Sequence, residues 1–344
     1  MREVFLSTSS VEPHRRSEYW RELNSSLRDV SSVDEGGNSA LEGSMKLRMF
    51  GTIAISTHAF SAQRWRCEWH HAARSNTEHY RLTLVLAGNG KGDFNSTNLV
   101  CGPGDIFIVD SAQPYHMEVE AGRRLAMFIP RAALEKLVGR KNLHGLVLEH
   151  ASPMNTLLRD YMIGLSKVAH HLPGDESIAA SESLITLVAG GFSGLSADSI
   201  AHRSTGGQPF RQSVLDYINQ HVADPSLGIE RLMRRFCISR SHLYRLFEAD
   251  GGIARVIRDK RIELAYRQLV TPSPKQRARS IKELAYDCGF SNAEQFIRAF
   301  KTKFGATPHS VLMEQLHRQS SSDDAAKLVK DVQQIYALLK ANGL

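Results

Sequence analysis

Toward the C-terminal end of the chain, apolar positions follow helical spacing, stop, and then start again. Ile281 and Leu284 fall on one face of a helix, and Phe296 and Phe300, four residues apart, fall on one face of a second helix. Gly289 lies between the two runs, and glycine can end a helix in a left-handed conformation without a Cβ penalty. The stretch is therefore predicted to form two short helices joined by a sharp turn, the geometry of a helix-turn-helix.

Both predicted helices carry a start signal. Ser280 precedes Glu283 by three residues, and Ser291 precedes Glu294 by three. In such a capping box the hydroxyl and the carboxylate each accept a hydrogen bond from a free backbone N–H. We therefore expect a capping box at the start of each helix.

The same pattern occurs earlier in the chain. Residues 229–247 align with residues 281–300 when one extra residue is allowed in the second copy after the turn. Between the copies, residues 253–269 keep apolar residues at helical spacing without an internal Gly or Pro, which predicts one rigid connecting helix. A single copy would be explained better by an ordinary helical hairpin, but two copies favour a pair of helix-turn-helix units.

This arrangement resembles the DNA-binding domain of AraC-type transcription regulators over residues 210–314. The residues that carry the resemblance are SRSHLYRLF at 239–247, RIELAYRQL at 261–269 and IKELAYDCGFSNAEQFIRAFKTKFGATP at 281–308. Three positions depart from the family pattern: Cys237 replaces the turn glycine, Ile253-Ala254 replaces a Ser-Pro or Thr-Pro, and Val311 replaces an aromatic residue. Because of Cys237, we expect the first turn to be less cleanly formed than the second.

Charge supports the same interpretation. Residues 210–318 carry 19 Lys and Arg against 11 Asp and Glu, a net charge of +8, whereas residues 1–209 carry 21 against 22. The whole positive excess therefore lies in one region, as expected for a partner rich in phosphate. A solvated basic face is the alternative, and the two helix-turn-helix repeats make it the weaker one.

The second helix of a helix-turn-helix lies in the major groove, where exposed side chains near its start meet base edges. Leu243 and Phe247 are the expected core of the first unit, and Phe296 and Phe300 that of the second. The predicted DNA contacts are the outward positions, namely Arg240, Ser241, His242, Tyr244 and Arg245 in the first unit and Asn292, Ala293, Glu294, Ile297 and Arg298 in the second. The resemblance implies that Ser241, Tyr244 and Arg245 read bases.

Some of these residues have structural alternatives. Arg245 and Arg298 are each expected either to contact guanine or to pair with a nearby helix carboxylate. Glu294 is expected to cap its helix rather than to accept from cytosine. Ala293 or Ile297 is suited to touch a thymine methyl group.

Two recognition helices held by one rigid helix would enter successive major grooves roughly 34 Å apart, so one subunit would read a directional site of roughly 20 base pairs. Basic residues around them are candidate phosphate contacts, although solubility explains any single one equally well. They are Arg255, Arg258, Lys260, Lys275, Arg277, Arg279, Lys301 and Lys303.

Residues 50–130 alternate in short apolar runs with turn signals, which predicts strands. The phrase Pro103-Gly104-Asp105 before an apolar strand, followed by Pro114-Tyr115-His116, resembles a cupin sensor domain over residues 40–130, which AraC-type regulators often carry N-terminally. Residues 131–190 return to helical spacing. The family resemblance implies that these helices form the dimer contact, and the alternative is that they only cover the barrel.

The expected fold is α+β: an N-terminal cupin-like β-barrel with a helical dimerisation segment, then an all-α domain with two helix-turn-helix units. Domain boundaries follow from the Gly- and Ser-rich stretch before the helical repeat. We predict a sensing domain at 1–190, a linker at 191–209, a DNA-binding domain at 210–318 and an extension at 319–344 with an amphipathic helix over 321–342.

The alternative from another class is a metal-dependent cupin enzyme with an appended regulatory domain. Cupin metals are held by two or three His and a carboxylate. His58, His70, His71, His79 and His116 invite that interpretation, but no His-x-His followed by Glu occurs on the first strand pair, so we expect no metal, no cofactor and no catalysis. A small organic effector is favoured instead, with Trp65, Trp69, His70 and Tyr80 as weak candidate contacts, since large aromatics are more often core.

The four cysteines are scattered without paired zinc spacing, and no apolar run reaches the length of a membrane span, so a cytoplasmic protein is expected. We predict a transcription regulator that binds double-stranded promoter DNA under control of a small-molecule effector, which shifts the population of conformations. The family resemblance implies activation, with a homodimer and RNA polymerase as partners. An architectural protein that binds DNA without sequence preference is a third alternative.

Overall fold

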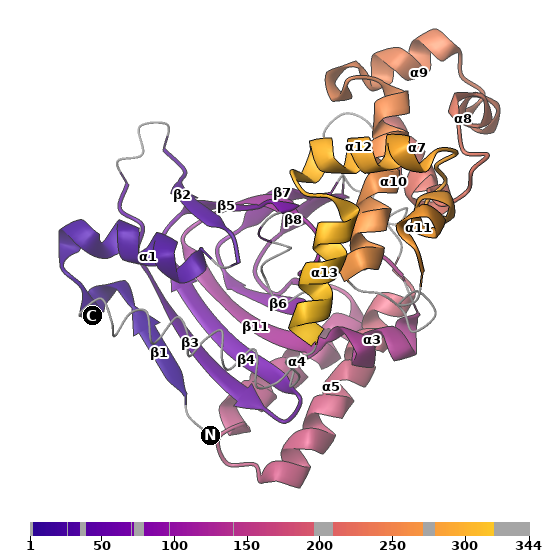
Figure 1. The fold of residues 1–344 in the computed structure, drawn as a ribbon. Coiled ribbons are helices and arrows are strands. Elements are labelled where there is room, and N and C mark those ends of the chain that lie inside the picture. Colours follow the sequence, from indigo (N-terminus) through magenta and orange to yellow (C-terminus); the bar gives the residue numbers. More distant parts are fainter. Residues whose placement is uncertain are drawn as a thin grey trace. The chain divides into compact units, whose positions relative to one another are not determined.

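The structure is a computed structural model that describes residues 3–25, 27–34, 39–69, 71, 79–95, 97–139, 141–195, 209–270 and 279–319 (Figure 1). The chain divides into two compact units, one of strands and helices in the N-terminal part and one of helices in the C-terminal part. Most of the predicted linker and the predicted amphipathic helix at 321–342 lie outside the described residues.

The N-terminal unit is built from two antiparallel sheets. The seven-stranded sheet has the order β1 (Val4–Ser7), β3 (Gly43–Phe50), β4 (Ile53–Phe60), β11 (Gly122–Pro130), β6 (His79–Ala87), β9 (Ile106–Asp110) and β12 (Val147–Leu148). The five-stranded sheet has the order β2 (Asp29–Ser32), β5 (Gln63–Cys67), β10 (Tyr115–Val119), β7 (Gly90–Phe94) and β8 (Thr97–Cys101).

Apolar side chains from both sheets meet in one core. Trp65 and Met117 of the five-stranded sheet cluster with Val85 and Phe107 of the seven-stranded sheet. Successive residues of a strand point to opposite faces, so each strand gives alternate residues to this interior. The unit is thus a two-sheet sandwich, which confirms the β-rich expectation for residues 40–130, although the described strands form two sheets and not one closed barrel.

The fold extends further toward the N-terminus than the strand pattern indicated. Strands β1 and β2 and helix α1 (Arg16–Asn24) belong to it, with the short 3₁₀ turns η1 (Thr8–Ser10) and η2 (Pro13–Arg15). Trp20 of α1 and Leu41 are buried in the same core as Trp65. Residues before 40 therefore complete the sandwich.

Helices follow strand β11, as the helical spacing of residues 131–190 predicts: α3 (Arg131–Val138), then, after β12, α4 (Pro153–Val168) and α5 (Gly174–Ser193). Arg131 of α3 forms a buried ion pair with Asp110 of β9. Burial alone would raise the pKa of Asp110, but Arg131 holds it at about 2, so the pair is charged and fixes α3 to the sheet.

The C-terminal unit consists of helices: α7 (Pro209–His221), α8 (Ile229–Phe236), α9 (Arg240–Leu246), the turn η3 (Glu248–Asp250), α10 (Ile253–Val270), α11 (Ile281–Asp287), α12 (Ala293–Phe304) and α13 (Pro308–Gln319). The predicted connecting helix is confirmed as α10. No helix of the described part is long and apolar enough to cross a membrane.

Each half of this unit has its own apolar centre. Leu232, Leu243 and Phe247 pack with residues of α7 and α10 in the first half. Phe296 and Phe300 of α12 are fully buried in the second half. The four residues expected to anchor the recognition helices are thus all in the core.

Candidate nucleic-acid interface

The first turn is made by a residue that is not glycine. Cys237 follows α8 in a left-handed conformation with φ of +52°, and its backbone N–H bonds to the carbonyl of Met233. Ser239 then caps α9 by accepting from the backbone N–H of His242. The turn forms, contrary to the expectation that cysteine would leave it less cleanly formed, at a conformational cost of about 1–2 kcal/mol.

The second turn contains a glycine, as predicted, and Gly289 has a φ of +83°. The capping box of Ser280 and Glu283 is present, which confirms one predicted helix start. The box of Ser291 and Glu294 is not formed, because Asn292 is the N-cap of α12 and its Oδ1 accepts from the N–H groups of Glu294 and Gln295 at 2.7 and 3.3 Å. The carboxylate of Glu294 is exposed and is not needed to start the helix.

Arg261 of α10 joins the two helix-turn-helix units of the C-terminal domain, a role that the sequence pattern did not indicate. Its guanidinium donates to the backbone carbonyls of Val222, Asp224 and Leu227, which precede α8, at 2.9 to 3.3 Å. A Cβ on Gly289 would lie only 2.7 Å from the Nε of Arg261. The second turn therefore needs glycine both for its conformation and for the close approach of this side chain.

A buried charge cluster fixes the second recognition helix to the connecting helix. The carboxylate of Glu263 lies 2.7 Å from Lys303 of α12 and 3.2 Å from Lys260. Burial alone would raise the pKa of Glu263, but the two lysines hold it at about 2. Lys260 is buried and Lys303 half-buried, and both are engaged with Glu263, so the structure favours their structural role over phosphate contact.

The first recognition helix, α9, presents a polar and basic face. Arg240, Ser241, His242, Tyr244 and Arg245 are all exposed. Arg240 donates to Glu230 of α8 at 2.6 Å, and the ring of His242 lies 5.9 Å from that of Phe210. Arg245 forms no ion pair with any described carboxylate, so the alternative structural role is not observed for it.

The second recognition helix, α12, presents a mixed face. Glu294, Ile297 and Arg298 are exposed, Ala293 is half-buried, and Asn292 is occupied in capping. Arg298 has no carboxylate partner within the described ranges. An apolar side chain, an acid and a base therefore stand side by side at the start of this helix.

The remaining basic residues differ in whether they form ion pairs. Arg279 pairs with Asp287, and Arg255 and Arg258 each lie within 3.7 Å of Asp259. Lys301 is exposed. Lys275 and Arg277 lie outside the described residues.

The weak effector candidates of the N-terminal unit do not gather at one place. Trp65 is buried between the sheets, in edge-to-face contact with Phe60 at 5.2 Å. Tyr80 is buried on the other face of the seven-stranded sheet, where its hydroxyl donates to Glu135 of α3 at 3.1 Å. Trp69 is half-buried. His70 lies outside the described residues, and among the described ones no group of His, Cys, Asp or Glu is placed to hold a metal.

Family models match both units. A model described as a helix-turn-helix domain matches residues 232–313, and one described as an AraC-binding-like domain matches residues 29–191. The transcriptional activator NphR of Rhodococcus sp is 23% identical over 280 residues, which cover 76% of this chain and 78% of that protein. The regulatory protein SoxS of Salmonella typhimurium is 28% identical over 103 residues, covering 29% of this chain and 91% of SoxS.

The fold is similar to a solved regulator. The crystal structure of the AraC-like transcriptional activator CuxR superimposes with a TM-score of 0.53 at 20% identity, covering 78% of this chain and 96% of that one. The two matched domains occur in the same order as the two units of the structure, and the helix-turn-helix match covers most of both helix-turn-helix units. The chain belongs to the AraC family of DNA-binding transcription regulators.

Proposed function

We propose that this protein is a transcription activator that reads a directional DNA site of roughly 20 base pairs with two recognition helices. The observation that carries the proposal is that α9 and α12 are both anchored by buried side chains and both leave the start of the helix exposed. One helix, α10, connects the two helix-turn-helix units. Two different recognition helices held by one rigid helix would read a DNA site that has a direction.

Arg245 and Arg298 are the proposed principal base readers. Each is exposed and unpaired with any carboxylate in the described part of the chain. A guanidinium forks onto the O6 and N7 atoms of guanine, the commonest specific contact in the major groove. Ser241 and Tyr244 add less exclusive contacts beside Arg245.

The second helix offers further contacts. Ala293 and Ile297 suit a thymine methyl group, and Glu294, which does not cap α12, suits the amino group of cytosine. Arg240 and Asn292 are engaged within the protein, so their proposed role is to position each recognition helix on the sugar-phosphate backbone of the DNA.

The N-terminal domain supplies control in this proposal. Residues 1–190 bind a small-molecule effector and mediate a homodimer, residues 191–209 link, and residues 210–318 bind DNA. The effector stabilises one arrangement of the chain over another, because a ligand shifts an equilibrium by its difference in affinity for the two states. RNA polymerase is the proposed partner of the DNA-bound protein.

Selection of genomic fragments tests this function. Purified full-length protein is incubated with sheared genomic DNA at physiological salt, and the retained fragments are sequenced. Enrichment of one directional motif of about two helical turns is expected. Retention without enrichment, with affinity that collapses as salt rises, would instead indicate an architectural protein that ignores sequence.

A further inference from the structure

Two arginines lie buried inside the N-terminal sandwich. Arg28 precedes β2 and is 5% exposed, and Arg81 on β6 is 9% exposed. Both guanidiniums donate to the same atom, the hydroxyl oxygen of Tyr115 on β10, at 3.3 and 2.9 Å. Two positive charges, one from the side of each sheet, therefore converge on a single neutral oxygen.

The side chains that contact the two arginines are neutral groups. Beyond Tyr115, Arg28 donates to the side-chain oxygen of Asn24 at 3.2 Å and lies 4.0 Å from the ring centre of Trp65. Within the described residues, neither Arg28 nor Arg81 forms an ion pair with an acid. Arg131, buried elsewhere in the same unit, shows the usual solution, since it pairs with Asp110 and Glu135.

The electrostatic environment reflects this excess of charge. Burial lowers the pKa of the Arg28 guanidinium, and the nearby Arg81 lowers it further, although Tyr115 acts in the opposite direction. Burial together with Arg28 and Arg81 lowers the pKa of His58 to about 3, so this ring is neutral at physiological pH. The site is thus ready to accept negative charge.

Several buried atoms beside the arginines have a proton to donate and no acceptor in the described structure. They are Nε of Arg28, Nε1 of Trp65 and Oγ1 of Thr83. Trp65 stacks on Arg28, and Thr83 follows Arg81 by two residues on the same strand and so points to the same face. Leaving a buried donor without an acceptor is costly, so a molecule that offers acceptor atoms here would be stabilised by these donors.

We propose that this cluster, the Arg28–Arg81 site, binds a small organic acid through its carboxylate, and that this acid is the effector; the inference rests on the proposed function. The guanidinium fork matches a carboxylate, and Trp65 and Thr83 supply further donors to its oxygens. Aromatic and apolar residues surround the cluster, among them Phe94, stacked on Tyr115 at 4.9 Å, and Met117. Apolar neighbours suit an organic tail better than a fully hydrated inorganic anion.

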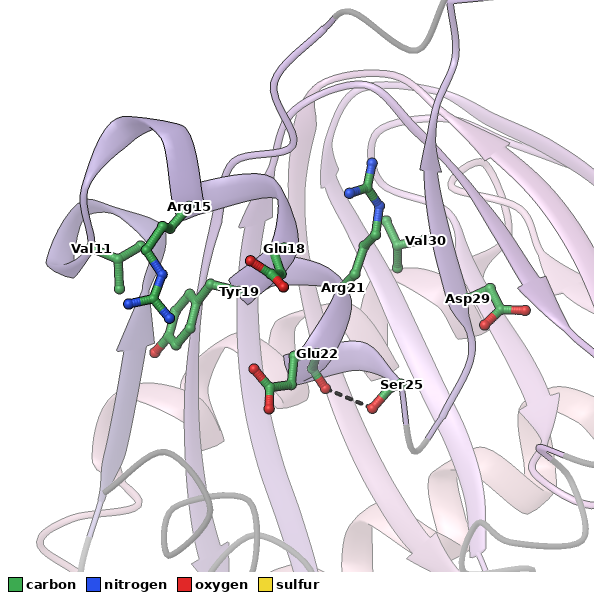
Figure 2. Close-up of a pocket in the computed structure, with 9 residues that line it drawn as sticks. All are labelled: Val11, Arg15, Glu18, Tyr19, Arg21, Glu22, Ser25, Asp29 and Val30. Atoms are coloured by element: carbon green, nitrogen blue, oxygen red, sulfur yellow. Dashed lines mark hydrogen bonds between the residues drawn. The ribbon is translucent and has the colours of Figure 1, made fainter. Parts of the chain in front are cut away.

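The groove between α1 and β2 is a weaker place for the effector. It encloses about 710 Å³, and Figure 2 shows the side chains that line it. Arg15 and Arg21 stand there with Glu18, Glu22 and Asp29. Because acids and bases are mixed, this groove has no excess of positive charge to select an anion.

Thermal unfolding of the full-length protein tests the site. The probes are phenylacetate and hexanoate, each compared with its neutral amide, with inorganic phosphate, and with sodium chloride at equal ionic strength. We expect the acids to raise the unfolding temperature by several degrees and to change the fluorescence of the tryptophans, while the amides and chloride do neither. This comparison needs no variant, so it holds even where a substitution prevents folding.

Arg81→Met separates ligand binding from structural support. We expect it to weaken acid binding about ten- to a hundred-fold, the effect of losing a charged hydrogen bond. Its unfolding temperature without ligand should equal or exceed that of the wild type, because an uncompensated buried charge has been replaced by an apolar chain. Arg64→Met is the matched control, since Arg64 pairs with Glu118 at 2.7 Å on the exposed side of β5 and should leave acid binding unchanged.

The inference is overturned if acids and amides have equal effects, if none of the acids has an effect, or if only inorganic phosphate stabilises the protein. It is also overturned if Arg81→Met lowers the ligand-free unfolding temperature and keeps the acid response, since Arg81 would then be structural. The genomic selection on the same preparation distinguishes the two proposals. Specific DNA binding without a response to acids would contradict only the effector site. Loss of sequence preference would contradict the proposed function, whatever the response to acids.

Discussion

The two helix-turn-helix units share their buried positions but differ in how each turn is held. The first turn places Cys237 in a left-handed conformation, and its recognition helix has seven residues. The second turn uses Gly289 against Arg261, and its recognition helix has twelve residues and is tied to α10 through Lys303. The repeated fold is therefore stabilised by different interactions in its two copies.

The difference extends to the faces that we propose meet DNA. The helix α9 offers Tyr244 and Arg245, a polar and basic pair, whereas α12 offers an acid and Ile297 beside Arg298. Different side chains read different base edges. Two recognition helices with different exposed side chains, held by α10, explain how a single chain would recognise a DNA site that has a direction.

The largest effect should come from the aromatic core of the second unit. Phe300 is fully buried, with ring centres of Phe296, Tyr266 and Phe304 at 5.6, 6.2 and 4.6 Å. We expect Phe300→Ala to lower the free energy of unfolding of the C-terminal unit by about 3–5 kcal/mol, measured by urea denaturation followed by helical circular dichroism. Leu243→Ala in the first unit should cost about 2–5 kcal/mol and toward the lower part of that range. A loss below about 1 kcal/mol for Phe300→Ala would contradict the assigned core.

The charge cluster gives the next effect. Glu263→Gln removes the carboxylate that pairs with buried Lys260 and with half-buried Lys303, and we expect a loss of about 3 kcal/mol in unfolding free energy. Glu230→Gln breaks the exposed pair with Arg240 in the first unit and should cost less than about 1 kcal/mol. Equal losses would show that the second unit is not anchored more firmly than the first.

Acid should remove the contribution of Glu263. Its pKa is lowered from 4.5 to about 2 in the folded chain, so its stabilisation is present above the unfolded value and is lost as the pH falls through the folded one. The difference in stability between the wild type and Glu263→Gln should therefore be constant near neutral pH and shrink below pH 4.5 toward pH 2. Denaturation at a series of pH values measures it, and a difference that grows with acid would reverse the assigned sign.

The smallest effect should come from exchanging the turn residues. Cys237→Gly should stabilise the first unit by up to about 1 kcal/mol, because glycine tolerates the left-handed conformation. Gly289→Ala should destabilise the second unit by about 1–3 kcal/mol, because its φ is positive and its Cβ would press on Arg261. Hydrogen exchange of the helices on each side of the turn distinguishes the two units, and effects of the same sign would refute the contrast between the turns.

Periodicity was enough to predict the helical domain. The spacing of Leu243, Phe247, Phe296 and Phe300 identified the core, and the absence of Gly and Pro from 253–269 predicted α10. The second helix start was wrong by one residue, because Ser291 fits the capping motif and only the backbone geometry selects Asn292. Arg261 gave no signal, since its partners are backbone carbonyls far away in sequence.

The N-terminal interior could not be predicted in the same way. Strand alternation assigns residues to a face but does not say that a charged residue such as Arg81 is buried, because charges normally face water. Arg28 comes from a segment before β2 whose strand pattern is too short to detect. The proposed Arg28–Arg81 site depends on contacts between residues that are distant in the chain, such as those of Tyr115 with both arginines.

The most direct test of two separate readers is motif selection with single variants. Full-length wild type, Arg245→Ala and Arg298→Ala are each used to select sites from random DNA at physiological salt. We expect each variant to relax preference at a different base pair, the two positions lying about one helical turn apart, with a discrimination loss of about 1–3 kcal/mol at each. Relaxation at the same position, or a uniform loss of affinity that leaves the motif unchanged, would contradict recognition by two helices.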